Sequence, residues 1–208
     1  MSDYKTSNPK VFILFPDGVG LRNFAFTHFK EIGEQQGFDI TYWNNTIFSL
    51  QEELGYPELK IESTKIHPKT TVLSHARKRV ELALSRKRTN DKVYATYRFP
   101  LRWNSLKNTA KSVFVKFHET FSATPQSWQK LMDQMNAAER STARYQEVKA
   151  QLEAKQPDIV FCTTQRATQA IAPLLAAQDL GIKTACWIYS WDNLPKGMST
   201  VETDYYFV

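Results

Sequence analysis

An unbroken apolar run near the start of the chain constrains the fold most. Residues 10–16 read KVFILFP and end at Asp17 and Gly18. A strand that is apolar on both faces is typical of the centre of a parallel sheet, because helices cover it on both sides. The sequence therefore predicts a buried parallel strand here, followed by a loop.

The segment after this loop completes a strand–helix–strand unit. Residues 20–36 carry apolar side chains near helical spacing, and Gly37 is a suitable residue just past a helix end. Residues 38–43 alternate and predict a second strand. The first 43 residues thus predict a β-α-β unit.

The last third of the chain repeats this pattern. Residues 157–164 predict a strand, residues 167–180 a helix that ends before Gly181, and residues 182–189 another buried strand. Residues 204–208 are apolar and aromatic and predict a further strand in which the chain stops. We therefore expect that the natural protein continues beyond this strand or pairs with a second chain.

The segment of about residues 45–156 has a different pattern. Its apolar residues recur at helical spacing, for example Val72, Ala76 and Val80, and it contains many basic residues. The predicted fold class is α/β: a Rossmann-like parallel sheet flanked by helices, with a large basic helical insertion at about 45–156. We expect residues 1–208 to form one domain.

Charge and composition narrow the classes of partner. The 208 residues carry a net charge of +6, which favours an anionic partner such as a nucleic acid, an anionic membrane surface or a phosphorylated substrate. The two cysteines, Cys162 and Cys186, lie in predicted buried strands and indicate no disulfide framework, which fits a reducing compartment. The four scattered histidines provide no metal-ligand spacing. Without a recognisable signal peptide or an apolar run long enough to span a bilayer, we expect a cytoplasmic location, either soluble or peripheral on the inner membrane face.

The loop after the first strand is the first candidate site. Gly18, Gly20 and Asn23 stand where a dinucleotide-binding loop has its three glycines, and a helix that starts here attracts anions. The third glycine is replaced, and no acidic residue ends the second strand, where Asn44 and Asn45 stand. The match to a dinucleotide site is therefore weak. The alternative is a simple turn and N-cap.

The loop after residues 182–189 is the second candidate site. It reads SWDNLPKG at residues 190–197 and offers a carboxylate, a carboxamide and an amine that can hydrogen-bond a polyhydroxylated ligand, although the same residues form ordinary turns. If both strands are parallel, this loop and the Asp17 loop open on the same edge of the sheet. A third turn, at residues 163–166, predicts an N-cap at Thr163 or Thr164 and an arginine, Arg166, that can reach a phosphate.

Residues 77–116 form a basic stretch with interleaved aromatic residues. Such a stretch suits the interface of an anionic bilayer. Nucleic acid is a competing partner, which no recognised motif supports, and a solvated basic helix face is the third alternative. The residues predicted to bind a membrane are Arg86, Lys87, Arg88, Arg98, Arg102, Trp103, Lys107 and Lys111.

The SWDN block at residues 190–193, combined with the strand at 157–164 and the FPDGVGLRNF segment at 15–24, resembles the N-terminal domain of bacterial GT-B-type glycosyltransferases, in particular surface-polysaccharide enzymes. The resemblance covers about the first 45 and the last 55 residues. It implies a domain that binds a sugar or lipid-linked acceptor, facing a C-terminal domain that binds the nucleotide-sugar donor and is absent from these 208 residues. It also implies that no metal is needed.

The resemblance further implies roles for individual residues. Asp17 stands where relatives place the base that accepts the acceptor proton, often a histidine, and Asp192 is the second candidate. The residues expected to bind the acceptor are Gly18, Gly20, Arg22, Asn23, Thr164, Arg166, Ser190, Asn193 and Lys196. The alternative to this enzyme is a non-catalytic Rossmann-like module that binds an anionic membrane surface or nucleic acid.

Overall fold

The computed structural model describes residues 8–164, 166–190, 196–197 and 199–208. A single sheet of parallel strands lies at its centre, in the order β3-β2-β1-β4-β5-β6. The strands are β1 (Lys10–Phe15), β2 (Asp39–Asn44), β3 (Glu58–Lys60), β4 (Ile159–Cys162), β5 (Lys183–Trp187) and β6 (Tyr205–Phe207). This is the strand order of a doubly wound Rossmann-like sheet, and it confirms the predicted fold class.

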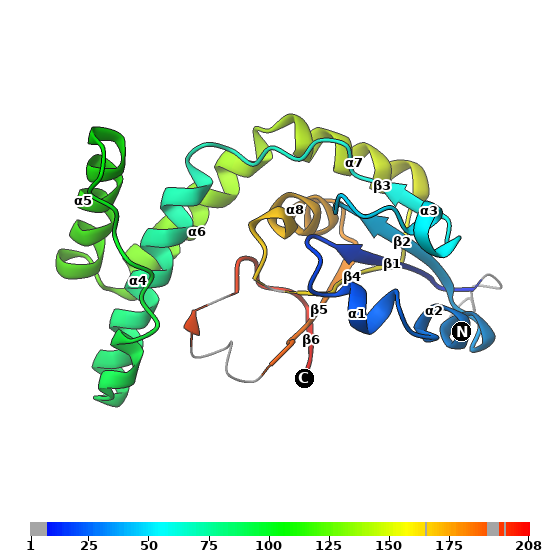
Figure 1. Cartoon of the computed structure of the whole chain (residues 1–208), viewed down its shortest axis with the longest axis horizontal. Coiled ribbons are helices and arrows are strands. Elements are labelled where there is room, and N and C mark those ends of the chain that lie inside the picture. Colours follow the sequence, from blue (N-terminus) through cyan, green and yellow to red (C-terminus); the bar gives the residue numbers. More distant parts are fainter. Residues whose placement is uncertain (1–7, 165, 191–195, 198) are drawn as a thin grey trace.

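Helices cover both faces of the sheet (Figure 1). The short helices α1 (Leu21–Phe24) and α2 (Phe29–Gln35) lie on one face, while α7 (Ala143–Lys155) and α8 (Ile171–Asp179) lie on the other. The predicted helix ends at Gly37 and Gly181 are confirmed, since both glycines have positive φ angles of 86° and 72°.

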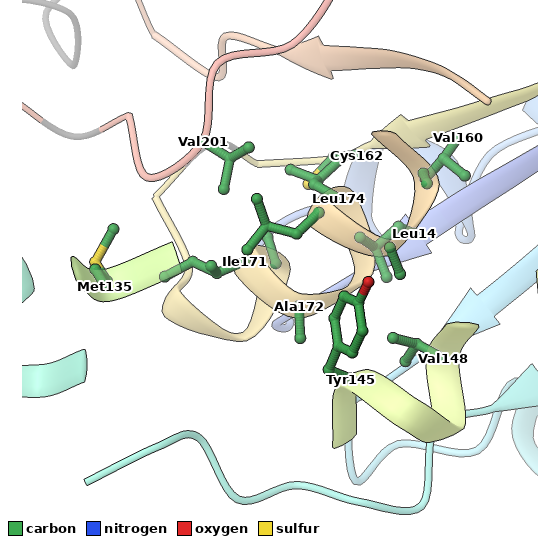
Figure 2. Close-up of a cluster of buried hydrophobic side chains, with 14 of the residues drawn as sticks. Leu14, Met135, Tyr145, Val148, Val160, Cys162, Ile171, Ala172, Leu174 and Val201 are labelled. Carbon is green, nitrogen blue, oxygen red and sulfur yellow. The ribbon is translucent and has the colours of Figure 1, made fainter. Parts of the chain in front are cut away.

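The central strand β1 has buried side chains on both faces, as its sequence predicts. Phe12 and Leu14 belong to the cluster beneath α7 and α8, whereas Ile13 and Phe15 belong to the cluster beneath α1. Figure 2 shows the first cluster, in which α8 side chains such as Ile171 lie among residues from the strands and the other helices. The core therefore fixes β1 as the sheet centre.

The helix predicted over residues 20–36 is interrupted, so that prediction is wrong in its continuity. Residue Ala25 caps α1, and α2 begins only at Phe29. Between the two helices, the Thr27 hydroxyl donates a hydrogen bond to the Asn23 carbonyl. The Phe26 ring packs against Phe48, with ring centroids 5.5 Å apart. A side chain that bonds the backbone in this way competes with helix continuation.

The middle segment is mainly helical, as predicted. It contains α3 (Leu50–Leu54), α4 (Thr70–Thr89), the 3-10 helix η1 (Lys92–Ala95), α5 (Leu106–Phe121), α6 (Pro125–Arg140) and α7. Helices α4, α5 and α6 extend away from the sheet, with α5 outermost (Figure 1).

Two parts of the predicted insertion, one strand and one helix, belong to the Rossmann-like core and not to the extended segment. Strand β3 pairs in parallel with β2 at the sheet edge. Helix α7 packs on the sheet, where Gln151 accepts a hydrogen bond from the Trp43 indole at 2.6 Å and donates to the Lys60 carbonyl at 2.8 Å. The segment that extends away from the sheet is therefore shorter than the predicted insertion at residues 45–156.

The two cysteines are neighbours in the sheet. Cys162 of β4 and Cys186 of β5 are register partners, and both are buried free thiols. The hydrogen-bond interaction of the Cys186 thiol with Cys162, together with burial, raises the pKa of Cys186.

Candidate functional site at the carboxyl edge of the sheet

The point between β1 and β4 is where the sheet reverses its direction of growth. The chain leaves β1 toward β2 on one side, and it leaves β4 toward β5 on the other. In open parallel sheets this switch point, at the carboxyl ends of the strands, is where a crevice for ligands forms. The carboxyl edge of this sheet is therefore the candidate site.

Two predicted loops leave this edge together. Asp17 follows β1, and Ser190 follows β5, which is separated from β1 only by β4 and runs parallel to it. The prediction that these loops open on one edge is confirmed for the described residues. Asp192 and Asn193, which the sequence also indicates, lie outside the described residues.

The Asp17 loop is a tight turn. The Asp17 carboxylate accepts a hydrogen bond from the backbone N–H of Val19 at 3.0 Å, and Asp17 remains half-buried. Helix α1 follows, but its N-cap is Gly20 and no side chain caps it. The loop therefore contains the turn that the sequence offers as an alternative to a ligand site. The N-cap that this alternative also included is not formed by Asp17, because Gly20 occupies that position. Gly18, Arg22 and Asn23 are exposed on this loop and on α1.

The turn after β4 differs from the predicted N-cap. The Thr164 hydroxyl accepts a hydrogen bond from the Arg166 backbone N–H at 3.4 Å, and the following 3-10 helix η2 (Thr168–Ala170) has Ala167 as its N-cap, without a side-chain bond. Thr164 is fully buried, whereas Arg166 is exposed. The Arg166 side chain is therefore accessible to solvent at this turn.

Three cationic side chains lie near enough to interact electrostatically, and we call them the cationic corner: Lys78 of α4, Arg166 after β4 and Lys196 after β5. The pKa of Lys78 is lowered to about 8, mainly by burial and then by the charges of Arg166, Arg77 and Lys196, while Glu81 opposes this effect. The amine of Lys78 lies 3.8 Å from the centre of the Phe99 ring. Positive charge that is concentrated in this way favours an anionic ligand.

The insertion helix α4 is joined directly to the loop after β5. The buried Arg77 donates to the Gly197 carbonyl at 3.1 Å and pairs with Glu81 at 2.9 Å. Arg77, Lys78 and Arg79 read in the sequence as part of a solvated basic face, but all three are buried. The sequence contains no local signal for this, because α5, α6 and the residue 197 region cover α4 only in the folded chain.

A buried arginine of α7, which the sequence reasoning missed, ties several loops of this edge together. Arg144 is 1% exposed and donates to the Asn45 side chain and the Gln169 carbonyl, both at 2.7 Å. A further bond of 2.5 Å reaches the Ser63 carbonyl, and Asn45 in turn donates to the Pro16 carbonyl at 3.1 Å. Burial lowers the pKa of Arg144 to about 10 although nearby carboxylates oppose this. The guanidinium thus positions segments that follow β1, β2 and β4.

The residues predicted to bind a membrane separate into groups. Arg102 and Lys111 line a hollow between α4 and α5, whereas Arg86, Lys87 and Arg98 line a second hollow around Glu119. Arg88, Trp103 and Lys107 are exposed and line neither hollow. These eight residues are thus divided between two hollows and exposed positions outside both.

Within the described part of the chain, no cluster of three or more histidine, cysteine, aspartate or glutamate residues is arranged to hold a metal ion. Nor does any described helix combine the length and apolarity that crossing a bilayer requires.

The fold and the site define a class: a doubly wound, Rossmann-like α/β domain whose carboxyl edge is bordered by basic insertion helices. Comparison with protein-family models, with curated proteins and with solved structures finds no match to this chain.

Proposed function

We propose that this chain is the acceptor-binding half of a GT-B-type glycosyltransferase that acts on a sugar or lipid-linked acceptor, in surface polysaccharide or glycolipid synthesis. The observation that supports this is the common position of the Asp17 loop and Ser190 at the carboxyl edge of one parallel sheet. The nucleotide-sugar site would lie on a second domain or partner subunit.

In this proposal Asp17 acts as the general base. The acceptor hydroxyl attacks the anomeric carbon of the donor, the bond from that carbon to the nucleotide phosphate oxygen breaks, and the hydroxyl proton moves to the Asp17 carboxylate. A sugar hydroxyl needs a base within about 3 Å to accept its proton as the new bond forms. The Val19 N–H holds one carboxylate oxygen of Asp17, which fixes the orientation of the group.

The test compares Asp17→Asn with Asp39→Asn in the complete enzyme, with nucleotide release from the nucleotide-sugar measured in the presence of acceptor. Asp39 is exposed at the opposite, amino end of β2 and serves as the matched control. We expect Asp17→Asn to lower turnover by about 100-fold or more, the contribution of a general base, and Asp39→Asn to leave it unchanged. Full turnover in Asp17→Asn would remove this residue from the mechanism.

A second candidate function is that of a non-catalytic module that docks on an anionic membrane. The observation that favours it is an exposed apolar face on α5, which we call the α5 outer stripe: Leu106, Val113, Phe117 and Phe121. Their exposed fractions are 92%, 55%, 54% and 77%. Their spacing of 7, 4 and 4 residues places them on one face of the helix.

The other side of α5 explains why its apolar face is left outside. Ser112, Val115 and Glu119 are buried toward α4, so two of the three inward residues are polar. Lys107 and Lys116 lie beside the α5 outer stripe on opposite sides, as helical spacing requires. An apolar face bordered by lysines matches the chemistry of an anionic bilayer interface.

Flotation with vesicles that contain about 30% phosphatidylglycerol tests this candidate, with neutral phosphatidylcholine vesicles for comparison. We expect binding to the anionic vesicles, weakened by salt, and its loss in the double variant Phe117→Ser/Phe121→Ser. Ile32→Ser is the control, since Ile32 is equally exposed (56%) but lies on α2. Equal binding of both variants would contradict docking through α5, and retardation of nucleic acid with no vesicle binding would favour the nucleic-acid alternative.

A further inference from the structure

A hollow of about 600 Å³ lies between α4, α5 and the segment at residues 99–102. We call it the α4–α5 hollow. Lys78, Arg102 and Lys111 supply three positive charges to its lining, and no described carboxylate lines it. At its inner end it reaches Thr168 of η2, next to the cationic corner.

The second basic hollow of the insertion differs from the α4–α5 hollow because a carboxylate is among its lining residues. It is lined by Arg86, Lys87, Arg98 and Lys116, but Glu119 lines it as well. Glu119 pairs with Arg98 at 3.0 Å and with Lys116 at 3.8 Å, so part of its positive charge is already neutralised within the protein. No carboxylate is among the described residues that line the α4–α5 hollow, although Glu81 acts on Lys78 from outside this lining.

Neutral polar groups line the α4–α5 hollow between the cations. The His75 Nε2 atom is buried there without a hydrogen-bond partner. Burial and the charge of Arg79 lower the pKa of His75, while its hydrogen bond with the Phe99 backbone opposes this effect. The single N–H of the neutral ring is thus engaged with Phe99, and Nε2 is an acceptor. Ser74 and Asn108 supply the neutral donors of this lining.

The remaining wall of the hollow is apolar. Val72, Phe99 and Val115 line it, and the Phe99 ring lies beside the Lys78 amine. A volume of about 600 Å³ is in the range of small-molecule sites, and it exceeds what a single small anion fills. The lining therefore combines a strongly cationic part with an apolar part.

We infer that the α4–α5 hollow binds the phosphoryl group of a ligand. Arginine offers a planar fork of donors that matches phosphate oxygens, and the two lysines offer compact charges. This site is distinct from the Asp17 loop, and the inference does not depend on glycosyl transfer.

The experiment measures the affinity of the full chain for inorganic pyrophosphate by titration calorimetry at about 50 mM salt. The test variant is Arg102→Gln/Lys111→Gln, whose side chains lie at the outer part of the hollow and leave the buried Lys78 in place. The control is Lys92→Gln/Lys155→Gln, which removes the same charge from exposed positions outside the hollow. Thermal unfolding of both variants checks that the fold is kept.

We expect the test variant to bind pyrophosphate at least about tenfold more weakly, since it loses charge-assisted hydrogen bonds, and the control to change less than about twofold. An equal loss in both variants would show that net charge alone is responsible and would overturn the inference. Absence of binding by the unaltered chain at low salt would overturn it as well. Neither result bears on Asp17-dependent turnover, so failure here is distinguishable from failure of the proposed function.

A second comparison identifies the source of the phosphoryl group. Glycerol 3-phosphate and monomeric dihexanoyl phosphatidic acid share the same headgroup chemistry and differ in their acyl chains. If the lipid binds more tightly and the test variant loses this binding, the ligand is a lipid whose headgroup contacts the cations and whose acyl chains contact Val72 and Val115. Equal binding would support a water-soluble phosphorylated ligand. Failure of the test variant to weaken either one would overturn the site.

Discussion

A Cβ atom on Gly20 would lie 2.2 Å from the Thr163 hydroxyl oxygen and 2.3 Å from its Cβ atom. Thr163 is buried and cannot easily withdraw, because its hydroxyl donates to the Leu14 carbonyl at 3.0 Å. Gly20 has an ordinary φ of −77°, so the position needs a glycine for space and not for backbone freedom. This close approach joins the loops after β1 and β4 at the switch point.

The Gly20→Ala variant should therefore be destabilised, by about 1–3 kcal/mol, which is the usual cost of overpacking. Gly18→Ala is the matched control in the same loop, because the nearest atom to its added methyl group is Leu21 Cδ1 at 4.0 Å. Urea unfolding of the two variants measures the difference. A Gly20→Ala protein as stable as the Gly18→Ala protein would show that the loops adjust freely.

Replacement of the buried Arg144 by methionine should lower the free energy of unfolding by about 2–4 kcal/mol. The change leaves the Gln169 and Ser63 carbonyls and the Asn45 side chain without their charged donor, and buried acceptors without partners are costly. Lys149→Met on the same helix is the control, since its contact with Glu153 is 3.9 Å long and solvent-exposed. Similar denaturation midpoints for the two variants would contradict a structural role for Arg144.

Glu119→Gln tests how α5 is held against α4. Glu119 is 6% exposed and pairs with Arg79 at 2.6 Å and Arg98 at 3.0 Å. Removal of its charge leaves a buried arginine without its counter-ion, which typically costs about 3–5 kcal/mol. We expect faster amide exchange along α5, with Glu153→Gln as the exposed control. Unchanged exchange would mean that Val115 and its neighbours hold the helix without the ion pairs.

The sheet was predictable from the sequence because its strands are apolar on both faces. Continuous apolar runs predict buried parallel strands at residues 10–16, 157–164 and 182–189. Because parallel strands end at the same edge of a sheet, the loops that follow them all leave its carboxyl edge. The common position of Asp17 and Ser190 follows from that topology alone.

The remaining features depend on tertiary contacts that local patterns do not encode. Strand β3 is three residues long at the sheet edge, and its Glu-Leu-Lys sequence has too little periodicity to detect. Burial of Arg77 and Arg144 requires acceptors from distant segments, namely Gly197 and Gln169. The helical spacing of Leu106, Val113 and Phe117 predicts α5 correctly but cannot tell whether that face meets the core or, as found, the outside.

At the cationic corner, Arg166 lies close enough to Lys78 to affect its pKa. Burial lowers the pKa of Lys78 from its ordinary 10.5 to about 8, and the charge of Arg166 is the next largest cause. Arg166→Gln should therefore raise the pKa of Lys78, whereas the distant Arg88→Gln should leave it unchanged. Side-chain NMR titration of the lysine amines measures both values. Because the folded pKa of this base is depressed, the unfolded chain binds more protons between about pH 8 and 10.5, so Lys78 makes stability rise with pH across that window. Lys78→Met should flatten the rise, and an identical pH dependence in that variant would place the pKa of Lys78 near its ordinary value.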